Sequence, residues 1–159
     1  MPSGASPSYN LRFICDEQLG RLAKWLRLEG FDTRYECPID DQRLFLLARN
    51  EDRFILTRDR KLSAKTLWDA ILVIENTDYS KQLRELKGKM KLPKIKPFTR
   101  CLSCNELIAS VSKAVIKDRV PAEVCRTYKD FYTCPTCKKV YWQGSHVAAS
   151  KARLRRLKL

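Results

Sequence analysis

The pattern of apolar and polar residues predicts four short strands in the first part of the chain. The run Leu11–Cys15 is short and rich in apolar and aromatic residues, which favours a buried strand over a helix. Further strand-like segments follow at 31–35, 54–57 and 71–74. We therefore expect four strands, the first of which ends directly before Asp16.

Between these strands, apolar residues return at helical spacing. Residues 18–29 carry apolar side chains at i, i+3, i+4 and i+7, which predicts an amphipathic helix, and Gly30 suits a left-handed cap at its end. Two more helices are expected, one after Asp40 and one over 80–90. Alternating strands and helices predict an α/β fold, in which a parallel sheet is flanked by helices and joined by right-handed crossovers.

This pattern places four aspartates at the ends of the strands, namely Asp16, Asp41, Asp59 and Asp78. The carboxyl ends of parallel strands share one edge of the sheet, where open α/β folds bind ligands. Carboxylates that converge there raise one another's pKa values unless a cation neutralises them, and oxygen ligands without a paired histidine favour Mg²⁺ or Mn²⁺. Such a cation activates water and stabilises displacement at a phosphodiester. All four aspartates are thus candidate catalytic residues, and the candidate metal ligands are Asp16, Asp41 and Asp59.

Each aspartate also has a structural alternative. Asp40 is more often a helix cap than a ligand, and either Asp40 or Asp41 can be the residue that faces the site. Asp59 can open the helix after the third strand, and Asp78 can stabilise a turn. For Asp16 this alternative is weakest, because a carboxylate at the end of a buried strand is costly without a partner.

Two CxxC pairs in the second part of the chain predict a metal site formed by Cys101, Cys104, Cys134 and Cys137. Four thiolates in this pattern form a closed tetrahedral site for a structural zinc ion in a small ribbon. Residues 105–133 exceed the roughly 15–20 residues of a common ribbon spacing, so this loop is expected to hold extra structure. Redox-active cysteines are the alternative. The odd number of cysteines and the lack of an export signal favour reduced thiols, and we expect a cytoplasmic protein.

These patterns divide the chain into four segments. We expect a flexible leader at 1–10, an α/β domain at 11–98, a zinc ribbon at 99–148 and a basic tail at 149–159. The lysine-rich, proline-spaced stretch before Phe98 is typical of an extended linker. The default expectation for the tail is that it is solvated, with nucleic-acid contact as the second possibility.

A formal charge of +14 indicates a polyanionic partner. Nucleic acid is favoured over a membrane, because no apolar run approaches the roughly 18 residues of a membrane span. The candidate nucleic-acid-binding residues lie beside the predicted sheet edge and around the second cysteine pair: Lys24, Arg58, Arg60, Lys138, Lys139, Tyr141, Trp142 and His146. Tyr141 and Trp142 are equally suited to the core of a small ribbon, and His146 to an ordinary structural role.

Five segments of the chain carry a resemblance to a known family: FICDEQLGRLAKWLRLEGFDTRY, DDQRLFLLAR, FILTRDR, RCLSCN and YTCPTCKKVYWQGSH. Together they are similar to the PIN-domain ribonucleases, and specifically to the branch known as the Mut-seven C-terminal RNase domain. The resemblance covers nearly all of residues 11–146, and it implies a PIN-like α/β core with a fused zinc ribbon that cleaves RNA with a divalent metal. The acidic positions of the family match three residues here and, less closely, a fourth: Asp16, Asp41, Asp59 and then Asp78. Glu17 stands where a small or apolar residue is expected, so it either adds a ligand or faces solvent.

Three classes of protein are compatible with these residues. We expect a metal-dependent ribonuclease with an acidic Mg²⁺ or Mn²⁺ site, in which the zinc ribbon assists RNA binding. The first alternative is an RNA-binding or adapter protein whose PIN-like core does not cleave, and a cleavage assay with metal and with EDTA separates the two. A phospho-receiver domain also carries acids at this edge, but it gives no reason for a basic zinc ribbon.

Overall fold

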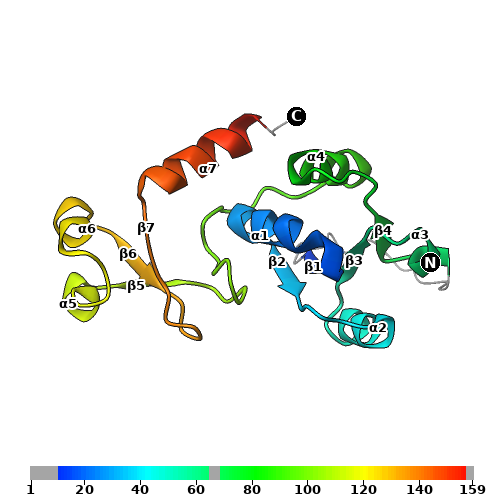
Figure 1. Ribbon diagram of the computed structural model, residues 1–159, viewed down its shortest axis with the longest axis horizontal. Coiled ribbons are helices and arrows are strands. Elements are labelled where there is room, and N and C mark those ends of the chain that lie inside the picture. The colour runs from blue at the N-terminus through cyan, green and yellow to red at the C-terminus, as the bar shows by residue number, and fades with distance from the viewer. Residues whose placement is uncertain (1–10, 65–68, 157–159) are drawn as a thin grey trace, which may run out of the picture.

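The computed structural model describes residues 11–64 and 69–156, so the expected leader at 1–10 lies outside the described residues. The first part of the described chain contains a four-stranded parallel sheet in the order β2-β1-β3-β4 (Figure 1). The strands are β1 (Arg12–Cys15), β2 (Asp32–Tyr35), β3 (Phe54–Thr57) and β4 (Ile71–Val73). The predicted α/β fold with a parallel sheet is confirmed.

Helices cover both faces of this sheet, because side chains along each strand alternate between the faces. One face is covered by α1 (Gly20–Glu29) and α4 (Tyr79–Lys89), and the other by α2 (Asp41–Asn50) and α3 (Arg60–Ala64). Phe13 and Cys15 belong to the first core, and Ile14 between them belongs to the second. Gly30 ends α1 with a φ of 101°, as the sequence predicted.

The chain leaves the two central strands toward opposite faces. After β1 it enters a 3₁₀ turn, η1 (Glu17–Leu19), and then α1, whereas after β3 it enters α3 on the other face. The two strands are direct neighbours, with Cys15 opposite Leu56. Such a divergence opens a crevice at the carboxyl ends of the strands. Asp16 and Asp59 therefore lie at the switch point of the sheet.

The second part of the described chain contains a three-stranded antiparallel sheet in the order β5-β6-β7. Its strands are β5 (Ala109–Val111), β6 (Phe131–Thr133) and β7 (Val140–Trp142). Between the two cysteine pairs lie β5, β6 and two short helices, α5 (Lys113–Ile116) and α6 (Ala122–Thr127). Ile116 and Phe131 are buried together in a small core of their own. The extra structure expected between the cysteine pairs is therefore present.

Arg27 of α1 joins the two parts of the chain. The residue is buried at the junction, with only 4% of its surface exposed. Its Nε donates to the Thr33 carbonyl, and its Nη1 donates to the carbonyls of Leu102 and Ser103 at 2.9 and 3.0 Å. The Asn105 side chain adds a second link, because its oxygen accepts from the Thr33 N–H at 2.9 Å. A buried cation with three carbonyl partners is well satisfied. The first cysteine pair is thereby fixed against α1 and β2.

The C-terminal helix α7 (Ser145–Arg156) returns from the ribbon toward α1 and α4 (Figure 1). Leu154 is 6% exposed and belongs to the core that these helices form with the sheet. The Arg153 guanidinium lies 4.7 Å from the centroid of the Tyr79 ring, which stacks on Trp25. Leu154 departs from the default expectation of a solvated tail because it packs into the first core, whereas the neighbouring Arg153, Arg155 and Arg156 are exposed.

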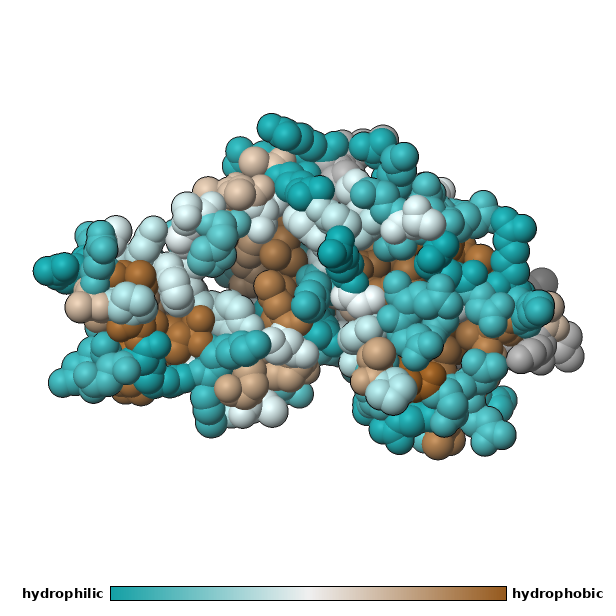
Figure 2. Space-filling view, viewed as in Figure 1, coloured by the Kyte–Doolittle hydropathy of each residue, from teal (hydrophilic) through white to brown (hydrophobic). Residues whose placement is uncertain are grey.

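Most of the face shown in Figure 2 is hydrophilic, and apolar residues show mainly in recesses between hydrophilic ones. Within residues 11–64 and 69–156, no helix is both long and apolar enough to cross a membrane. Most buried apolar residues of the described chain belong to three small cores.

Truncation of Leu154 tests whether α7 is part of the fold. We expect Leu154→Ala to lower the free energy of unfolding by about 2–3 kcal/mol, because the change removes buried apolar surface and leaves a cavity. Leu107→Ala is the matched control, since Leu107 is 59% exposed, and it should change stability by less than about 0.5 kcal/mol. Chemical denaturation measures both values, and equal effects of the two changes would contradict the packing of α7.

Candidate functional site

The hydroxyl of Thr57 links Asp16 and Asp59 at the carboxyl edge of the sheet. The Asp16 N–H donates to the carbonyl of Leu56 at 2.9 Å, which continues the pairing of β1 with β3. The buried Thr57 Oγ1 donates to Asp16 Oδ2 at 2.8 Å and accepts from the Asp59 N–H at 2.9 Å. The neighbouring strands β1 and β3 thereby place the Asp16 carboxylate beside the backbone segment that carries Asp59.

Both carboxylates keep lone pairs for a further ligand. Asp16 Oδ1 accepts from the Glu17 N–H at 2.6 Å, and Asp59 Oδ1 accepts from the Lys61 N–H at 2.7 Å. The second contact is the one expected of a residue that opens α3. Since a carboxylate offers about four lone-pair sites, the donors seen here do not saturate either side chain. Both residues are partly exposed, so a ligand can reach them from solvent.

The other acids lie at the starts of helices. Asp40 caps α2 by accepting a backbone N–H at 2.8 Å, and Asp41 is an exposed residue of the first turn. Asp78 caps α4, and hydrogen bonds from the Ser80 side chain and the Lys81 N–H lower its pKa. The structure therefore shows the capping alternative for Asp40, and it gives Asp78 a structural role as a helix cap where the sequence suggested a turn.

The cysteine quartet is the only group of three or more His, Cys, Asp or Glu side chains in the described chain that could hold a metal ion. The four predicted aspartates do not form such a group there. Asp16 and Asp59 are linked to each other through the Thr57 hydroxyl. Glu17 is exposed on η1. This geometry supports a site built on two acids more directly than one built on four.

The Sγ atoms of the four cysteines all lie within 4.8 Å of one another. Tetrahedral zinc with Zn–S bonds of about 2.3 Å separates its sulfur atoms by roughly 3.8 Å, and three of the Sγ pairs here are 3.2–3.5 Å apart. Each pair forms a tight turn, in which Asn105 donates to the Cys101 carbonyl and Lys138 to the Cys134 carbonyl. Asn105 and Lys138 both take positive φ values to complete these turns. The quartet can therefore bind a structural metal such as zinc.

The thiols of the quartet differ in their tendency to ionise. Burial raises the pKa of Cys101, but hydrogen bonds from the Tyr141 hydroxyl and from backbone N–H groups lower it to about 6. Burial and hydrogen bonds with the sulfur atoms of Cys134 and Cys101 raise the pKa of Cys104 to about 12. Four thiols this close cannot all carry a charge unless a cation neutralises them. The quartet thus has the chemistry of a metal site.

Three predicted nucleic-acid contacts are engaged within the ribbon instead. The Tyr141 hydroxyl lies 3.0 Å from Cys101 Sγ. The Trp142 ring packs beside Phe131 at 6.5 Å between centroids, and the His146 ring meets Trp142 edge-on at 5.9 Å. These contacts favour the structural alternatives for Tyr141, Trp142 and His146.

The basic residues predicted to contact nucleic acid differ in their exposure and in the partners that their side chains already have. Lys138 and Lys139 are exposed beside the second cysteine pair, and Arg60 forms an exposed ion pair at 2.8 Å with a glutamate after β4. Arg58, directly before Asp59, has a buried Nε without a hydrogen-bond partner. Lys24 lines a pocket at the start of α1. Lys24 is thus the predicted cation whose side chain lines an open pocket near the sheet edge, whereas the Arg58 Nε is covered.

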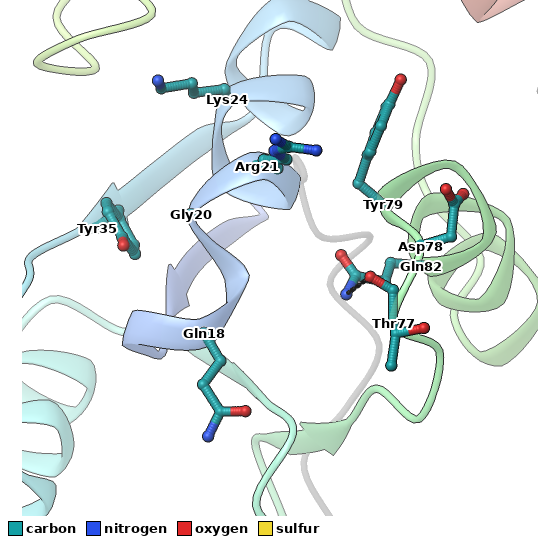
Figure 3. A pocket seen from close by; sticks show the side chains of 9 residues that line it. All are labelled: Gln18, Gly20, Arg21, Lys24, Tyr35, Thr77, Asp78, Tyr79 and Gln82. Carbon is teal, nitrogen blue, oxygen red and sulfur yellow. Dashed lines mark hydrogen bonds between the residues drawn. The ribbon is translucent and has the colours of Figure 1, made fainter.

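An open pocket of about 470 Å³ lies between α1 and α4 (Figure 3). Its walls are formed by Gln18, Gly20, Arg21, Lys24, Tyr35, Thr77, Asp78, Tyr79 and Gln82. The sequence indicated only Lys24 and Asp78 among these residues, because the others come together only when α1 packs on α4. Arg21 had a usable signal, since it lies one turn before Lys24 on the exposed side of a predicted helix.

Glu85 of α4 anchors the loop that forms one wall of this pocket. Its carboxylate accepts the N–H groups of Glu75 and Asn76 at 2.9 and 3.0 Å. Burial raises the pKa of Glu85, but hydrogen bonds from Lys89 and from these backbone groups lower it to about 2. The carboxylate is therefore ionised at neutral pH, and it holds the loop before α4 in place.

Comparison with known proteins finds one matching family. Residues 11–154 match the family model of the Mut7-C RNAse domain, which covers both the parallel sheet and the cysteine quartet. No curated protein and no solved structure matches the chain significantly. The resemblance to the Mut-seven C-terminal RNase domain is confirmed, and the family indicates a ribonuclease. Because the match spans nearly the whole sequence, the chain belongs to the Mut7-C RNAse domain family.

Proposed function

We propose that this protein is a metal-dependent ribonuclease of the PIN type, which cleaves RNA phosphodiester bonds at the edge formed by Asp16 and Asp59. Membership in an RNase family supports RNA as the substrate. The main structural support is the Thr57 hydroxyl, which joins the Asp16 carboxylate to the backbone of Asp59. These residues follow neighbouring parallel strands from which the chain diverges, the usual ligand position in such sheets.

Two carboxylates are enough for a Mg²⁺ or Mn²⁺ site. Mg²⁺ keeps several water ligands and is commonly held by one or two carboxylates together with substrate phosphates. Asp16 and Asp59 would hold the ion, with Asp41 and Asp78 as further candidates farther out along the edge. When bound, such a cation lowers the pKa of a water molecule and stabilises charge that develops on the phosphate.

The chain's own residues orient the acids and bind the RNA backbone in this proposal. Thr57 holds the Asp16 carboxylate toward β3, and the half-buried Arg58 adjoins Asp59 in the chain as a candidate phosphate contact. Lys24 and the exposed lysines Lys138 and Lys139 add phosphate contacts, and a formal charge of +14 favours polyanion binding. The reduced thiols that zinc requires are in keeping with a cytoplasmic location.

Asp16→Asn and Asp59→Asn test the acidic site. Each change keeps the side-chain size but removes a negative charge, so it should weaken Mn²⁺ binding and lower RNA cleavage about a hundredfold or more. RNA affinity should stay the same or rise, because less negative charge faces the phosphates. Cleavage rates with added Mn²⁺ and RNA binding without it measure the two effects separately.

The matched control for these variants is Asp118→Asn, since Asp118 is an exposed aspartate of the ribbon. It should cleave at the rate of the unchanged protein. Circular dichroism should show that all three variants are folded. Full specific activity in folded Asp59→Asn protein would contradict the proposed site.

The second candidate is an RNA-binding protein that does not cleave. It is favoured by one observation, namely that Asp40 and Asp78 serve as helix caps while no described group of three carboxylates gathers to hold a metal. Incubation of the unchanged protein with single-stranded RNA and Mn²⁺, with an EDTA control, separates the candidates. RNA that is bound but not cut under these conditions would favour the second one.

Zinc should be present at about one equivalent per chain, because four thiolates in two turns form one closed site. Cys101→Ser should lose the metal, whereas Cys37→Ser should retain it, since the exposed Cys37 lies outside the quartet. Elemental analysis of protein purified without chelators measures the zinc content. Metal-free protein with disulfide-bonded pairs would contradict this assignment.

A further inference from the structure

The pocket between α1 and α4 adjoins the proposed cleavage edge. One wall follows β1 and contains Gln18 and Gly20, and the opposite wall follows β4 and contains Thr77. In the sheet, β3 lies between β1 and β4, so the two walls flank the strand that leads to Asp59. A nucleotide bound in this pocket would therefore lie beside the phosphate at the acidic edge.

Two cations of α1 line the pocket. Arg21 and Lys24 are both exposed, and Figure 3 shows them on the same helix beside the cavity. The Arg21 guanidinium lies 6.0 Å from the centroid of the Tyr79 ring, whose position is set by stacking on Trp25 at 5.7 Å. A cation near the face of a fixed aromatic ring is favourably placed. These two side chains offer the charge that a phosphate group needs.

An amide lies at the bottom of the pocket with half of its hydrogen-bonding capacity used. Gln82 is only 4% exposed, and its Nε2 donates to the Asn76 carbonyl at 2.9 Å and to the Thr77 carbonyl at 3.4 Å. Among the described residues, no donor reaches its Oε1. Because its Nε2 is held by two carbonyls, Gln82 presents an acceptor in a fixed orientation.

The wall opposite Gln82 is equally fixed. The Tyr35 hydroxyl donates to the Glu17 carbonyl at 2.9 Å. A Cβ atom at position 20 would lie 2.7 Å from the Tyr35 oxygen, so the ring packs directly on the backbone of Gly20. An aromatic wall, an orienting acceptor and two cations are the groups with which proteins bind a single unstacked nucleotide.

We propose that this pocket binds one nucleotide of the RNA strand beside the scissile phosphate, with its phosphate at Arg21 and Lys24 and its base edge at Gln82. The proposal rests on the ribonuclease function above and adds a determinant of sequence preference. The Gln82 acceptor matches an exocyclic amino group, which cytosine carries at the position where uracil has a carbonyl oxygen. The pocket should therefore prefer cytosine over uracil.

Titration of the ¹⁵N-labelled full chain with cytidine 5′-monophosphate and with uridine 5′-monophosphate tests this proposal. We expect saturable amide shifts at Arg21 and Thr77, with cytidine monophosphate bound at least about threefold more tightly. Arg21→Gln combined with Lys24→Gln should weaken binding at least about tenfold, because two charged contacts to the phosphate are lost. Gln82→Met should remove the difference between the two nucleotides.

The matched control combines Arg49→Gln with Lys117→Gln, which removes two exposed charges outside the pocket and should change affinity less than twofold. If Gln82→Met does not fold, the comparison of the two nucleotides on the unchanged protein decides the role of the base.

Amide shifts confined to other surfaces, or binding that the Arg21 and Lys24 changes leave intact, would overturn the proposal. Equal affinities for the two nucleotides would overturn the assignment of the base edge. No divalent metal is added and no cleavage is measured, so failure of the ribonuclease function would leave these results unchanged.

Discussion

The parallel pairing of β1 with β3 is the interaction on which the proposed chemistry depends. It sets Cys15 opposite Leu56 and continues through the Asp16 N–H, so the Thr57 hydroxyl comes within 2.8 Å of the Asp16 carboxylate. Both strands are buried by cores on the two faces of the sheet, which fixes their register. A shift of one residue would turn every core side chain to the wrong face and would separate the two acids. The stability of the sheet and the geometry of the candidate site therefore have the same origin.

The ribbon is attached to this sheet by buried polar contacts rather than by a flexible linker alone. Burial lowers the pKa of Arg27, but its three carbonyl partners satisfy the guanidinium at the junction. Burial raises the pKa of Asp32, but hydrogen bonds from Arg53 and Asn105 outweigh this effect and lower it. Removal of one partner would leave a buried charge unsatisfied, which is costly in a low-dielectric interior. The position of the first cysteine pair is thereby coupled to the packing of α1 and β2.

Local patterns predicted the four strands of the parallel sheet, the helices α1, α2 and α4, and the Gly30 cap, because each depends on residues close together in sequence. The fold class followed from the alternation of these elements, and the two CxxC pairs identified the cysteine quartet. The packing of Leu154 could not be predicted, because a leucine among arginines also suits an exposed helix, and its partners lie in α1 and α4. The pocket was missed for the same reason, since Gln82 and Tyr35 acquire a shared role only through tertiary contacts. Asp16 follows β1, as the sequence predicted, and the other acids lie at the starts of helices. Local sequence alone does not decide whether such an aspartate caps a helix or binds a ligand.

The position of a bound Mn²⁺ ion would test the central claim most directly. Titration of the zinc-loaded, ¹⁵N-labelled full chain with Mn²⁺ broadens the amide signals nearest to the ion. A site at the switch point predicts that the amides of Asp16, Glu17 and Asp59 broaden first, while those of the α2 and α4 caps follow at higher concentration. Early broadening at Asp40 or Asp78 with none at Asp16 and Asp59, or no specific broadening at all, would contradict the account.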